Sequence, residues 1–302
     1  MERLWVEKYR PKKIKGIVGN EVLKTKFQKF IDDGEIPNIL LYGSAGTGKT
    51  TISKILLKSL DCEYLYVDGS NDTGVNVMRE KIGTFCGSVG FASLKIVFID
   101  EADYLSLASQ ACLRRLIEDS SDTTRFIFAC NYPEKFIDAV LSRFQMFEVK
   151  PPKIEDLIER AYLILRKENI TEYNDDDVQD LVKNCYPDLR KMIHTLQMNC
   201  IGSKLDLSVG GVFSETYKSE LIKMLKNKCS FESIRQFVND QSGIDYEIMY
   251  KILYDSIDEY VTNSSKRLQI RLYIGDYLYR HSIILDKEIN FMCLIDKILA
   301  TI

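Results

Sequence analysis

Short apolar runs alternate with longer amphipathic stretches along the first half of the chain. Runs rich in β-branched and aromatic residues predict strands at residues 38–42, 64–68, 95–100, 125–131 and 147–149. These runs show little alternation of polar and apolar positions, which is typical of parallel strands buried on both faces. Helical stretches are predicted between them, at residues 22–31, 49–60, 75–86 and 110–118. The pattern predicts an α/β fold, a parallel αβα sandwich of the kind that binds nucleotides.

The pattern changes at Pro151 and Pro152, because two prolines interrupt regular structure. All later elements are predicted to be helices, at residues 154–168, 175–184, 189–200, 215–227, 231–239, 246–261, 266–281 and 287–300. A break containing Gly210 and Gly211 separates the first three of these helices from the others. We therefore predict a nucleotide-binding domain at residues 1–152 and two helical regions, at 153–212 and 213–302.

Composition places the chain among soluble globular proteins. It has 302 residues, of which 45% are hydrophobic and 28% charged, enough apolar material for a proper core. Its apolar runs, such as Ile96–Ile99, are too short to cross a bilayer, and its first residues lack a signal-peptide core. We expect an intracellular protein, cytoplasmic or nuclear according to the organism, or in the host cytoplasm if the source is a phage.

Charge and cysteine usage narrow the chemistry further. The net charge of −3 argues against a protein that binds nucleic acid over its whole surface, because phosphate binding needs positive charge. Any DNA contact is therefore expected to be local. The eight cysteines contain no C-x-x-C pair and are accompanied by only two histidines. We interpret the cysteines as reduced thiols and expect no structural zinc.

A glycine-rich segment between a predicted strand and a predicted helix matches the pattern G-x-x-x-x-G-K-[ST]. It consists of Gly43, Ser44, Ala45, Gly46, Thr47, Gly48, Lys49 and Thr50. Glycines allow the backbone N–H groups to surround phosphates, and the positive end of the following helix points at them. We expect Lys49 to contact the γ-phosphate of ATP and Thr50 to offer its hydroxyl to Mg²⁺. The alternative is a glycine-rich turn without a ligand.

Two carboxylates follow the strand predicted at residues 95–100. Asp100 and Glu101 lie at the carboxyl end of a buried strand, where open α/β sheets bind ligands. Asp100 is expected to hold the hydration shell of Mg²⁺, and Glu101 to orient or deprotonate the attacking water. The alternative is a helix N-terminus enriched in acidic residues to suit the helix dipole.

Three further polar residues have both a catalytic and an ordinary explanation. Asn131 ends a buried strand, where its amide can hold the attacking water or merely start a turn. Arg143 precedes the last predicted strand, and Arg190 opens a helix beyond the proline pair. Each arginine can equally be a solvated surface charge.

Together these motifs resemble those of AAA+ ATPases of the clamp-loader type, most closely the small subunits of replication factor C and their tailed-phage counterparts. The opening Trp5-Val6-Glu7-Lys8-Tyr9-Arg10-Pro11 resembles the family signature W-[VT]-E-K-Y-R-P. The segments 18–20 and 37–43 and the Asp-Glu-Ala-Asp box at 100–103 extend the match. The resemblance covers about residues 3 to 200 and implies a AAA+ domain followed by a helical lid and a collar.

The resemblance also implies roles for individual residues, with ATP and Mg²⁺ as cofactors. The expected nucleotide contacts beyond the phosphate loop are Val6, Tyr9, Arg10, Val18, Thr51, Asn131 and Arg190. The first four would form the adenine pocket, Asn131 would be sensor 1, and Arg190 would be sensor 2. Arg143 would reach the ATP of a neighbouring subunit, and Phe144 stands where the family normally has cysteine.

The function implied by the resemblance is that of an ATPase subunit of a sliding-clamp loader in a cellular or viral replisome. The implied partners are the sliding clamp, primer-template DNA and other loader subunits in a pentameric oligomer, with no membrane. Candidates for contacts to the DNA backbone are Arg79, Lys81, Arg114 and Arg115. These four side chains can also form a solvated face or pair between subunits.

Two other functions remain open from the sequence. One is a hexameric AAA+ remodeller or branch-migration motor, and the other is a scaffold subunit whose nucleotide is not hydrolysed. The Glu7-Lys8-Tyr9-Arg10-Pro11 opening speaks against the motor. The presence of Lys49, Thr50, Asp100, Glu101 and Arg143 speaks against the scaffold, since a scaffold does not need them.

Overall fold

The computed structural model describes residues 4–71, 74–90, 92–206, 215–239 and 246–302. The chain forms two compact units, the first built from residues 1–160 and 185–194 and the second from 161–184 and 195–302. Residues of the predicted lid thus occur in both units. The division into three domains stays a prediction, and its boundary at residues 212 and 213 lies outside the described residues.

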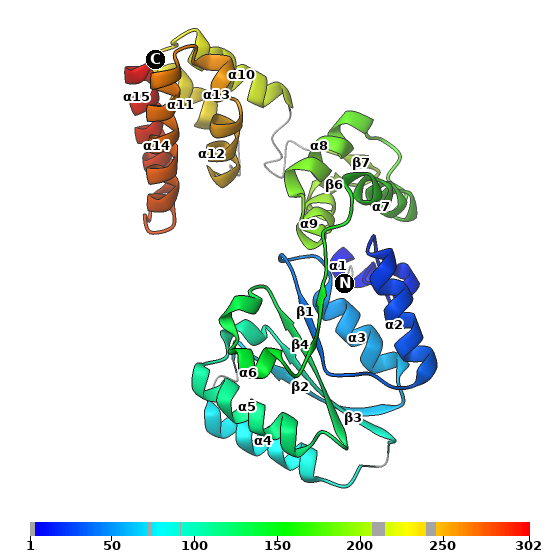
Figure 1. Ribbon diagram of the computed structural model, residues 1–302. Coiled ribbons are helices and arrows are strands. Elements are labelled where there is room, and N and C mark those ends of the chain that lie inside the picture. The colour runs from blue at the N-terminus through cyan, green and yellow to red at the C-terminus, as the bar shows by residue number, and fades with distance from the viewer. Residues whose placement is uncertain (1–3, 72–73, 91, 207–214, 240–245) are drawn as a thin grey trace. The chain divides into compact units, whose positions relative to one another are not determined.

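A five-stranded parallel sheet organises the first unit, as predicted (Figure 1). Its strands are β1 (Ile39–Tyr42), β2 (Cys62–Asp68), β3 (Leu94–Asp100), β4 (Thr124–Cys130) and β5 (Gln145–Glu148). Their order across the sheet is β2-β3-β4-β1-β5. The carboxyl ends of β3, β4 and β1 are therefore neighbours, although β1 and β3 are separated by more than fifty residues in the chain.

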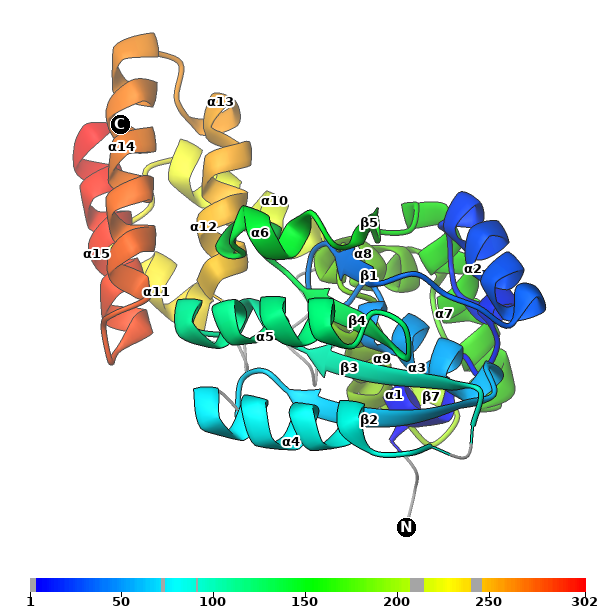
Figure 2. The same ribbon diagram turned by 60° about the horizontal axis from the view of Figure 1, so that its bottom comes forward.

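Helices cover both faces of this sheet. On one side lie α2 (Glu21–Asp33) and α3 (Lys49–Ser59), and on the other α4 (Val75–Gly87), α5 (Leu107–Asp119) and α6 (Asp138–Leu141) (Figures 1 and 2). Successive residues of β3 alternate between the two cores: Ile96 packs with the α2 and α3 side, and Val97 with the α4 and α5 side. Because both faces of the central strands are buried, β1, β3 and β4 consist mainly of consecutive apolar residues.

Short elements complete the first unit: α1 (Trp5–Lys8) and the 3-10 turns η1 (Ile14–Gly16), η2 (Ala102–Tyr104) and η3 (Pro133–Lys135). The buried amide of Gln110 on α5 donates to the carbonyl oxygens of Leu105 at 3.2 Å and Lys135 at 3.0 Å. Its oxygen accepts the N–H of Ile137 at 2.9 Å. One side chain thus ties the segments that follow β3 and β4 to the same helix.

Helices α7 (Ile154–Lys167), α8 (Asp175–Cys185) and α9 (Leu189–Asn199) follow the sheet. In the second unit, α9 leads into a hairpin of β6 (Cys200–Ile201) and β7 (Lys204–Leu205). The prediction that only helices follow the proline pair was therefore wrong. Each strand has only two residues, too few for an alternating pattern, and Gly202 takes a φ of 60° in the turn between them.

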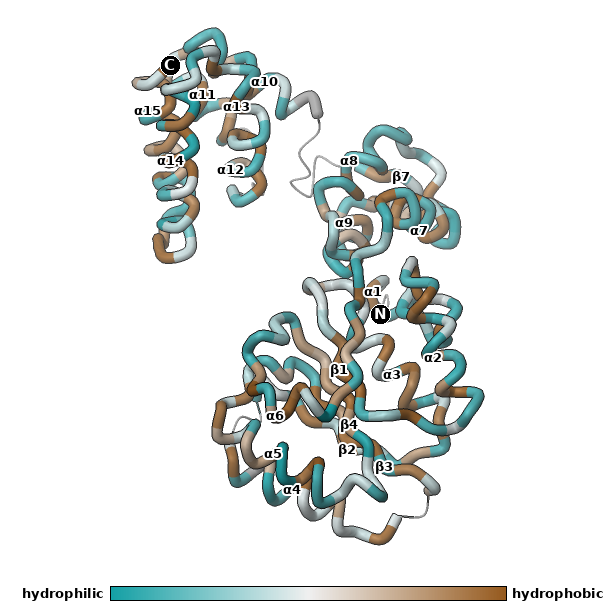
Figure 3. The backbone as a smooth tube through the Cα atoms, in the orientation of Figure 1, coloured by the Kyte–Doolittle hydropathy of each residue, from teal (hydrophilic) through white to brown (hydrophobic). Residues whose placement is uncertain are grey.

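The remaining helices of the second unit are α10 (Glu215–Lys226), α11 (Phe231–Asn239), α12 (Tyr246–Asp255), α13 (Ile257–Tyr260), α14 (Ser264–His281) and α15 (Lys287–Thr301). They share one apolar core, and Figure 3 shows hydrophobic and hydrophilic segments along α14 and α15. The helix predicted at residues 246–261 is divided at Ser256, where the Tyr260 hydroxyl donates to the Leu253 carbonyl oxygen at 2.8 Å. Among the described helices, none has the length and apolar character needed to span a membrane.

Candidate functional site

The glycine-rich loop connects β1 to α3, as the sequence predicts. Gly43, Gly46 and Gly48 have φ angles of 146°, 74° and 101°, which other residues rarely adopt. A Cβ atom on Gly43 would lie 2.5 Å from the Val149 carbonyl oxygen. Glycine is required here both for the backbone conformation and for the close approach to the segment after β5.

Lys49 is the first residue of α3, and its side chain folds back over the loop. The Nζ atom donates to the carbonyl oxygens of Gly43 and Ser44, both at 2.8 Å. Burial lowers the pKa of Lys49, while the nearby carboxylates of Asp103 and Asp100 raise it. The ammonium group is thus held inside the loop, where oxygen atoms of a phosphate can replace the two carbonyl acceptors.

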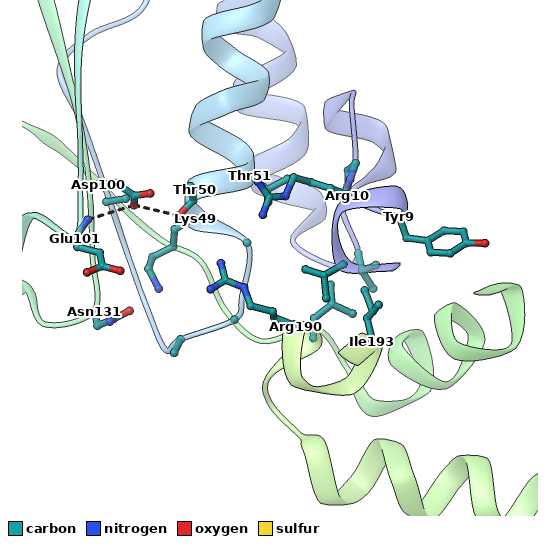
Figure 4. A pocket seen from close by; sticks show the side chains of 18 of the residues that line it. Tyr9, Arg10, Lys49, Thr50, Thr51, Asp100, Glu101, Asn131, Arg190 and Ile193 are labelled. Carbon is teal, nitrogen blue, oxygen red and sulfur yellow. Dashed lines mark hydrogen bonds between the residues drawn. The ribbon is translucent and has the colours of Figure 1, made fainter. Parts of the chain in front are cut away.

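Asp100 and Thr50 meet at the edge of the sheet (Figure 4). The Thr50 hydroxyl donates to Asp100 Oδ1 at 3.0 Å, and the Glu101 N–H donates to the same oxygen at 3.2 Å. Burial is the main cause that raises the pKa of Asp100. Glu101 has a left-handed backbone, with φ of 50°.

This pair suits Mg²⁺, which keeps several waters and takes one or two protein oxygens in addition to phosphate oxygens. In the part of the chain that the structure describes, no group of three or more His, Cys, Asp or Glu side chains can hold a metal by itself. A hydroxyl and a carboxylate beside a phosphate loop are the donors such an ion requires.

Asn131 follows β4 and lines the same pocket. Its backbone N–H donates to Oδ1 of the buried Asp103 at 3.3 Å. The other oxygen of Asp103 has no hydrogen-bond partner among the described residues, and the Lys135 Nζ lies 4.0 Å away. Sequence reasoning quoted Asp103 within the acidic box without giving it a role. The only available signal was its position in that box, because the contact joins residues 28 positions apart.

The opposite end of the pocket is formed by the segment around α1. The predicted residues Val6, Tyr9, Arg10 and Val18 all line it, together with Pro11. Arg10 forms an ion pair with Glu7 at 2.6 Å. Figure 4 shows the Tyr9 ring pointing away from Lys49 and Thr50, so Tyr9 presents its backbone rather than its ring to the loop side.

Residues 185–194 of the first unit close the pocket on one side. Arg190, which the resemblance implies as a nucleotide contact, lines the pocket together with Leu189 and Ile193. Asp188, which sequence reasoning missed, accepts the Lys191 N–H at 2.9 Å and so caps the start of α9. A Cβ atom on Gly46 would lie 1.9 Å from its Oδ1, so the bare backbone of Gly46 makes room for Asp188.

The loop residues divide into two groups. Those that line the pocket are Ala45, Gly46, Gly48, Lys49, Thr50 and Thr51. Gly43 and Ser44 provide the carbonyl oxygens for Lys49, and the Thr47 hydroxyl donates to the Ser44 carbonyl oxygen at 2.9 Å. This second group shapes the loop.

Arg143 is not among the residues that line the pocket. Its guanidinium contacts the Glu118 carboxylate and the Ala139 carbonyl oxygen, and the Asn38 amide donates to its backbone oxygen at 3.3 Å. Next to it, Phe144 is buried with its ring 4.5 Å from the ring of Phe128. The residue that replaces the family cysteine therefore belongs to the core of the sheet.

The four candidate DNA-binding side chains lie on α4 and α5, which pack side by side (Figure 2). Arg79, Lys81, Arg114 and Arg115 are all exposed. The Arg115 Nε lies 3.6 Å from the Asp119 carboxylate on the same helix. The structure thus places all four on neighbouring helices of one sheet face.

A family model and several known proteins match this chain. The model of the ATPase family associated with various cellular activities (AAA) matches residues 39–152. The replication factor C small subunit of Sulfurisphaera tokodaii is 31% identical over 98% of this chain and 95% of its own length. Replication factor C small subunit 1 of Pyrobaculum arsenaticum is 36% identical over 68% of this chain and 64% of its own length.

A solved structure of the Thermotoga maritima RuvB Holliday junction branch migration motor has a similar fold. It matches with a TM-score of 0.55 and 18% identity, over 80% of this chain and 86% of that one. At this level of identity the likeness concerns the fold alone.

Proposed function

Since the chain belongs to the AAA+ family of replication factor C small subunits, we propose that it uses ATP binding to open a DNA sliding clamp and ATP hydrolysis to release that clamp on primer-template DNA. The family match implies ATP binding and supports hydrolysis. The observation that carries the proposal is the meeting of Lys49, the Thr50–Asp100 pair and Asn131 in one pocket.

Each residue has a role in this proposal. Lys49 binds the phosphate oxygens, and Arg190 approaches them from the α9 side of the pocket. Thr50 and Asp100 hold Mg²⁺, which when bound neutralises charge on the phosphates. Glu101 orients the attacking water and accepts its proton, and Asn131 holds that water against the γ-phosphate. Asp103 positions Asn131 through its backbone N–H.

The proposed site is completed by a second subunit. Arg143 lies outside the pocket of its own chain, and its positive charge is suited to the transition state of a neighbour's ATP. Hydrolysis then depends on assembly. The proposed assembly is a pentameric loader that contains other subunits and acts on the clamp and the primer-template junction within the cell.

ATP turnover by the assembled complex tests this proposal. Primer-template DNA and clamp together should stimulate turnover, and Glu101→Gln should abolish the stimulated rate while ATP-dependent clamp binding persists. Equal ATP turnover with and without DNA and clamp would contradict the clamp-loader mechanism. Unchanged turnover in the Glu101→Gln complex would instead favour a non-hydrolysing scaffold subunit.

A second candidate is a branch-migration motor, the activity given for a solved structure that shares the fold. An assay of strand displacement from a four-way DNA junction distinguishes a motor from a clamp loader. A motor should move a four-way DNA junction at a rate proportional to ATP turnover and without any clamp. A loader should leave such junctions in place.

A further inference from the structure

Asp188 lies immediately before α9, the helix that brings Arg190 into the pocket. Its Oδ1 atom accepts the Lys191 N–H at 2.9 Å, and its carbonyl oxygen accepts the Met192 N–H at 3.0 Å. A carboxylate in this position satisfies an N–H group that the first turn of a helix leaves without a partner inside the helix. The side chain of Asp188 and the first turn of α9 are therefore held together.

The same carboxylate lies directly against the phosphate loop. A Cβ atom on Gly46 would overlap it, since Oδ1, Cγ and Oδ2 of Asp188 all lie within 2.8 Å of the place that this atom would take. The pattern G-x-x-x-x-G-K-[ST] requires glycine at positions 43 and 48 but leaves position 46 open. In this chain a φ of 74° and the contact with Asp188 both favour glycine there. The two segments belong to the same unit of the structure.

Two positive charges meet in the pocket beside this contact. Figure 4 shows the Arg190 side chain extending from α9 towards Lys49 of the loop. Burial lowers the pKa of Lys49, and the positive charge of Arg190 lowers it further. Because like charges repel, α9 is pushed away from the loop when no phosphate lies between the two side chains. The contact of Asp188 with Gly46 holds α9 in place against this repulsion.

We propose that Asp188 is a positioning residue, whose carboxylate seats α9 on Gly46 of the phosphate loop and thereby sets Arg190 against the phosphates of ATP. The proposal rests on ATP binding at this loop, as set out above. It gives the Asp188 side chain two functions, which are to cap α9 and to fix the distance of α9 from the loop. The contrary explanation is that Asp188 only caps α9.

Substitutions that remove the contact with Gly46 at little cost to the start of α9 distinguish these explanations. Asp188→Gly removes every side-chain atom that lies against the loop, and glycine is nearly as good as aspartate at the start of a helix. Asp188→Asn keeps both the contact and an oxygen that can cap the helix. Asp286→Gly is the matched control, because Asp286 caps α15 of the second unit by accepting the Ile289 N–H at 3.0 Å.

The dissociation constant for ATP with Mg²⁺ is measured by calorimetry on the full chain. Asp188→Gly is expected to weaken ATP binding about fivefold, a loss within the range usual for residues in contact. Arg190→Ala is expected to weaken it about tenfold or more, as the loss of a hydrogen bond to a charged group does. Asp188→Asn, Asp286→Gly, and Asp188→Gly added to Arg190→Ala should each stay within about twofold of their parent protein.

Thermal unfolding shows whether each variant is folded. If Asp188→Gly does not fold, Asp188→Ser takes its place, because serine keeps a capping hydroxyl and lacks both carboxylate oxygens. The same fivefold loss is then expected.

Four results would overturn the proposal. Wild-type ATP affinity in Asp188→Gly would show that Asp188 only caps α9. An equal loss with and without the Arg190 side chain would show that Asp188 does not act through it, and wild-type affinity in Arg190→Ala would show that this arginine does not bind the phosphates. A loss in Asp188→Asn as large as in Asp188→Gly would assign the effect to charge. Failure of the wild-type chain to bind ATP would instead remove the proposed ATPase function itself.

Discussion

Asp100 is a pocket residue whose burial lowers the stability of the folded chain at neutral pH. It lies at the end of β3 with 9% of its surface exposed, and burial raises its pKa. For a carboxyl group with a raised folded-state pKa, the stabilising contribution is present below the unfolded-state pKa and is lost as the pH rises through the folded-state pKa. At neutral pH the ionised form therefore lowers the free energy of unfolding, even with the Thr50 hydroxyl as a partner.

Asp100→Asn is accordingly expected to stabilise the chain at pH 7 and to lose about 10- to 100-fold in turnover, the usual cost of disturbing a partner of a metal's hydration shell. The gain in the free energy of unfolding should shrink as the pH falls below 3.8, the ordinary pKa of aspartate. Urea unfolding of wild type and variant at pH 7 and at a pH below 3.8 measures this gain in the free energy of unfolding. A variant less stable than wild type at pH 7 would contradict the assignment of burial as the cause.

Glu118 is expected to position Arg143, because its carboxylate contacts the guanidinium while Asn38 holds the backbone of the same residue. Glu118→Gln should lower kcat of the assembled complex about tenfold and leave the KM for ATP unchanged, since Arg143 is proposed to act only in the transition state. Steady-state kinetics provides both constants.

Asp119→Asn is the matched control for this prediction, since it removes the adjacent carboxylate, which pairs with Arg115 instead. Once Arg143→Ala is present, Glu118→Gln should have no further effect on kcat. Additive losses in the double variant would show that Glu118 acts elsewhere.

At the scale of elements, α5 joins the segments that follow β3 and β4 to the outer surface. Gln110, Leu113 and Ile117 on its inner side are buried against the sheet and its loops. Arg114 and Arg115 on its outer side are exposed. A shift of this helix therefore reaches the segments after β3 and β4 directly, through the hydrogen bonds of Gln110.

The exposed arginines of α4 and α5 should differ in their share of DNA binding. Arg79→Ala and Arg114→Ala are each expected to weaken the binding of the complex to DNA uniformly across sequences. Each should also reduce the slope of log Kd against log salt concentration by about 0.7 to 0.9, the value for one lost phosphate contact. Fluorescence anisotropy across a salt series measures this slope.

Arg115→Ala is expected to change the slope less, because Asp119 already neutralises part of its charge. Salt slopes that stay at the wild-type value in the Arg79 and Arg114 variants would assign these residues to a solvated face or a subunit contact.

At the scale of the whole molecule, the catalytic unit is expected to be an interface. Lys49→Ala is expected to disable the pocket of its own chain, and Arg143→Ala is expected to disable the chain's contribution to a neighbour. Mixing the two variants in one reconstituted complex should restore about a quarter of wild-type turnover if the chains assemble at random, because one interface in four then joins an intact pocket to an intact arginine. If the mixture turned over ATP no faster than the separate variants, Arg143 would have no role in a neighbour's hydrolysis.

Much of this protein was predictable from local signals. The five strands, the loop between β1 and α3 and the position of the acidic pair at the end of β3 were confirmed, because they depend on neighbouring residues in the chain. Two predictions from periodicity were wrong, because a short element or a contact outside the repeating pattern decided the structure. The strands of the hairpin β6–β7 are too short to give an alternating pattern. The helix break at Ser256 occurs beside a hydrogen bond from the Tyr260 hydroxyl to the Leu253 carbonyl oxygen, seven positions away.

The sequence by itself determined where the phosphate loop and the acidic pair lie along the chain, since both follow from local backbone and charge requirements. Only the tertiary structure decided how they meet. The strand order brings Asp100 and Asn131 beside the loop. Long-range contacts add Asp103 and Arg160 to the pocket and place Asp188 against Gly46 of the loop. Such contacts join residues up to 151 positions apart, and a pattern with a period of two or four residues contains no information about them.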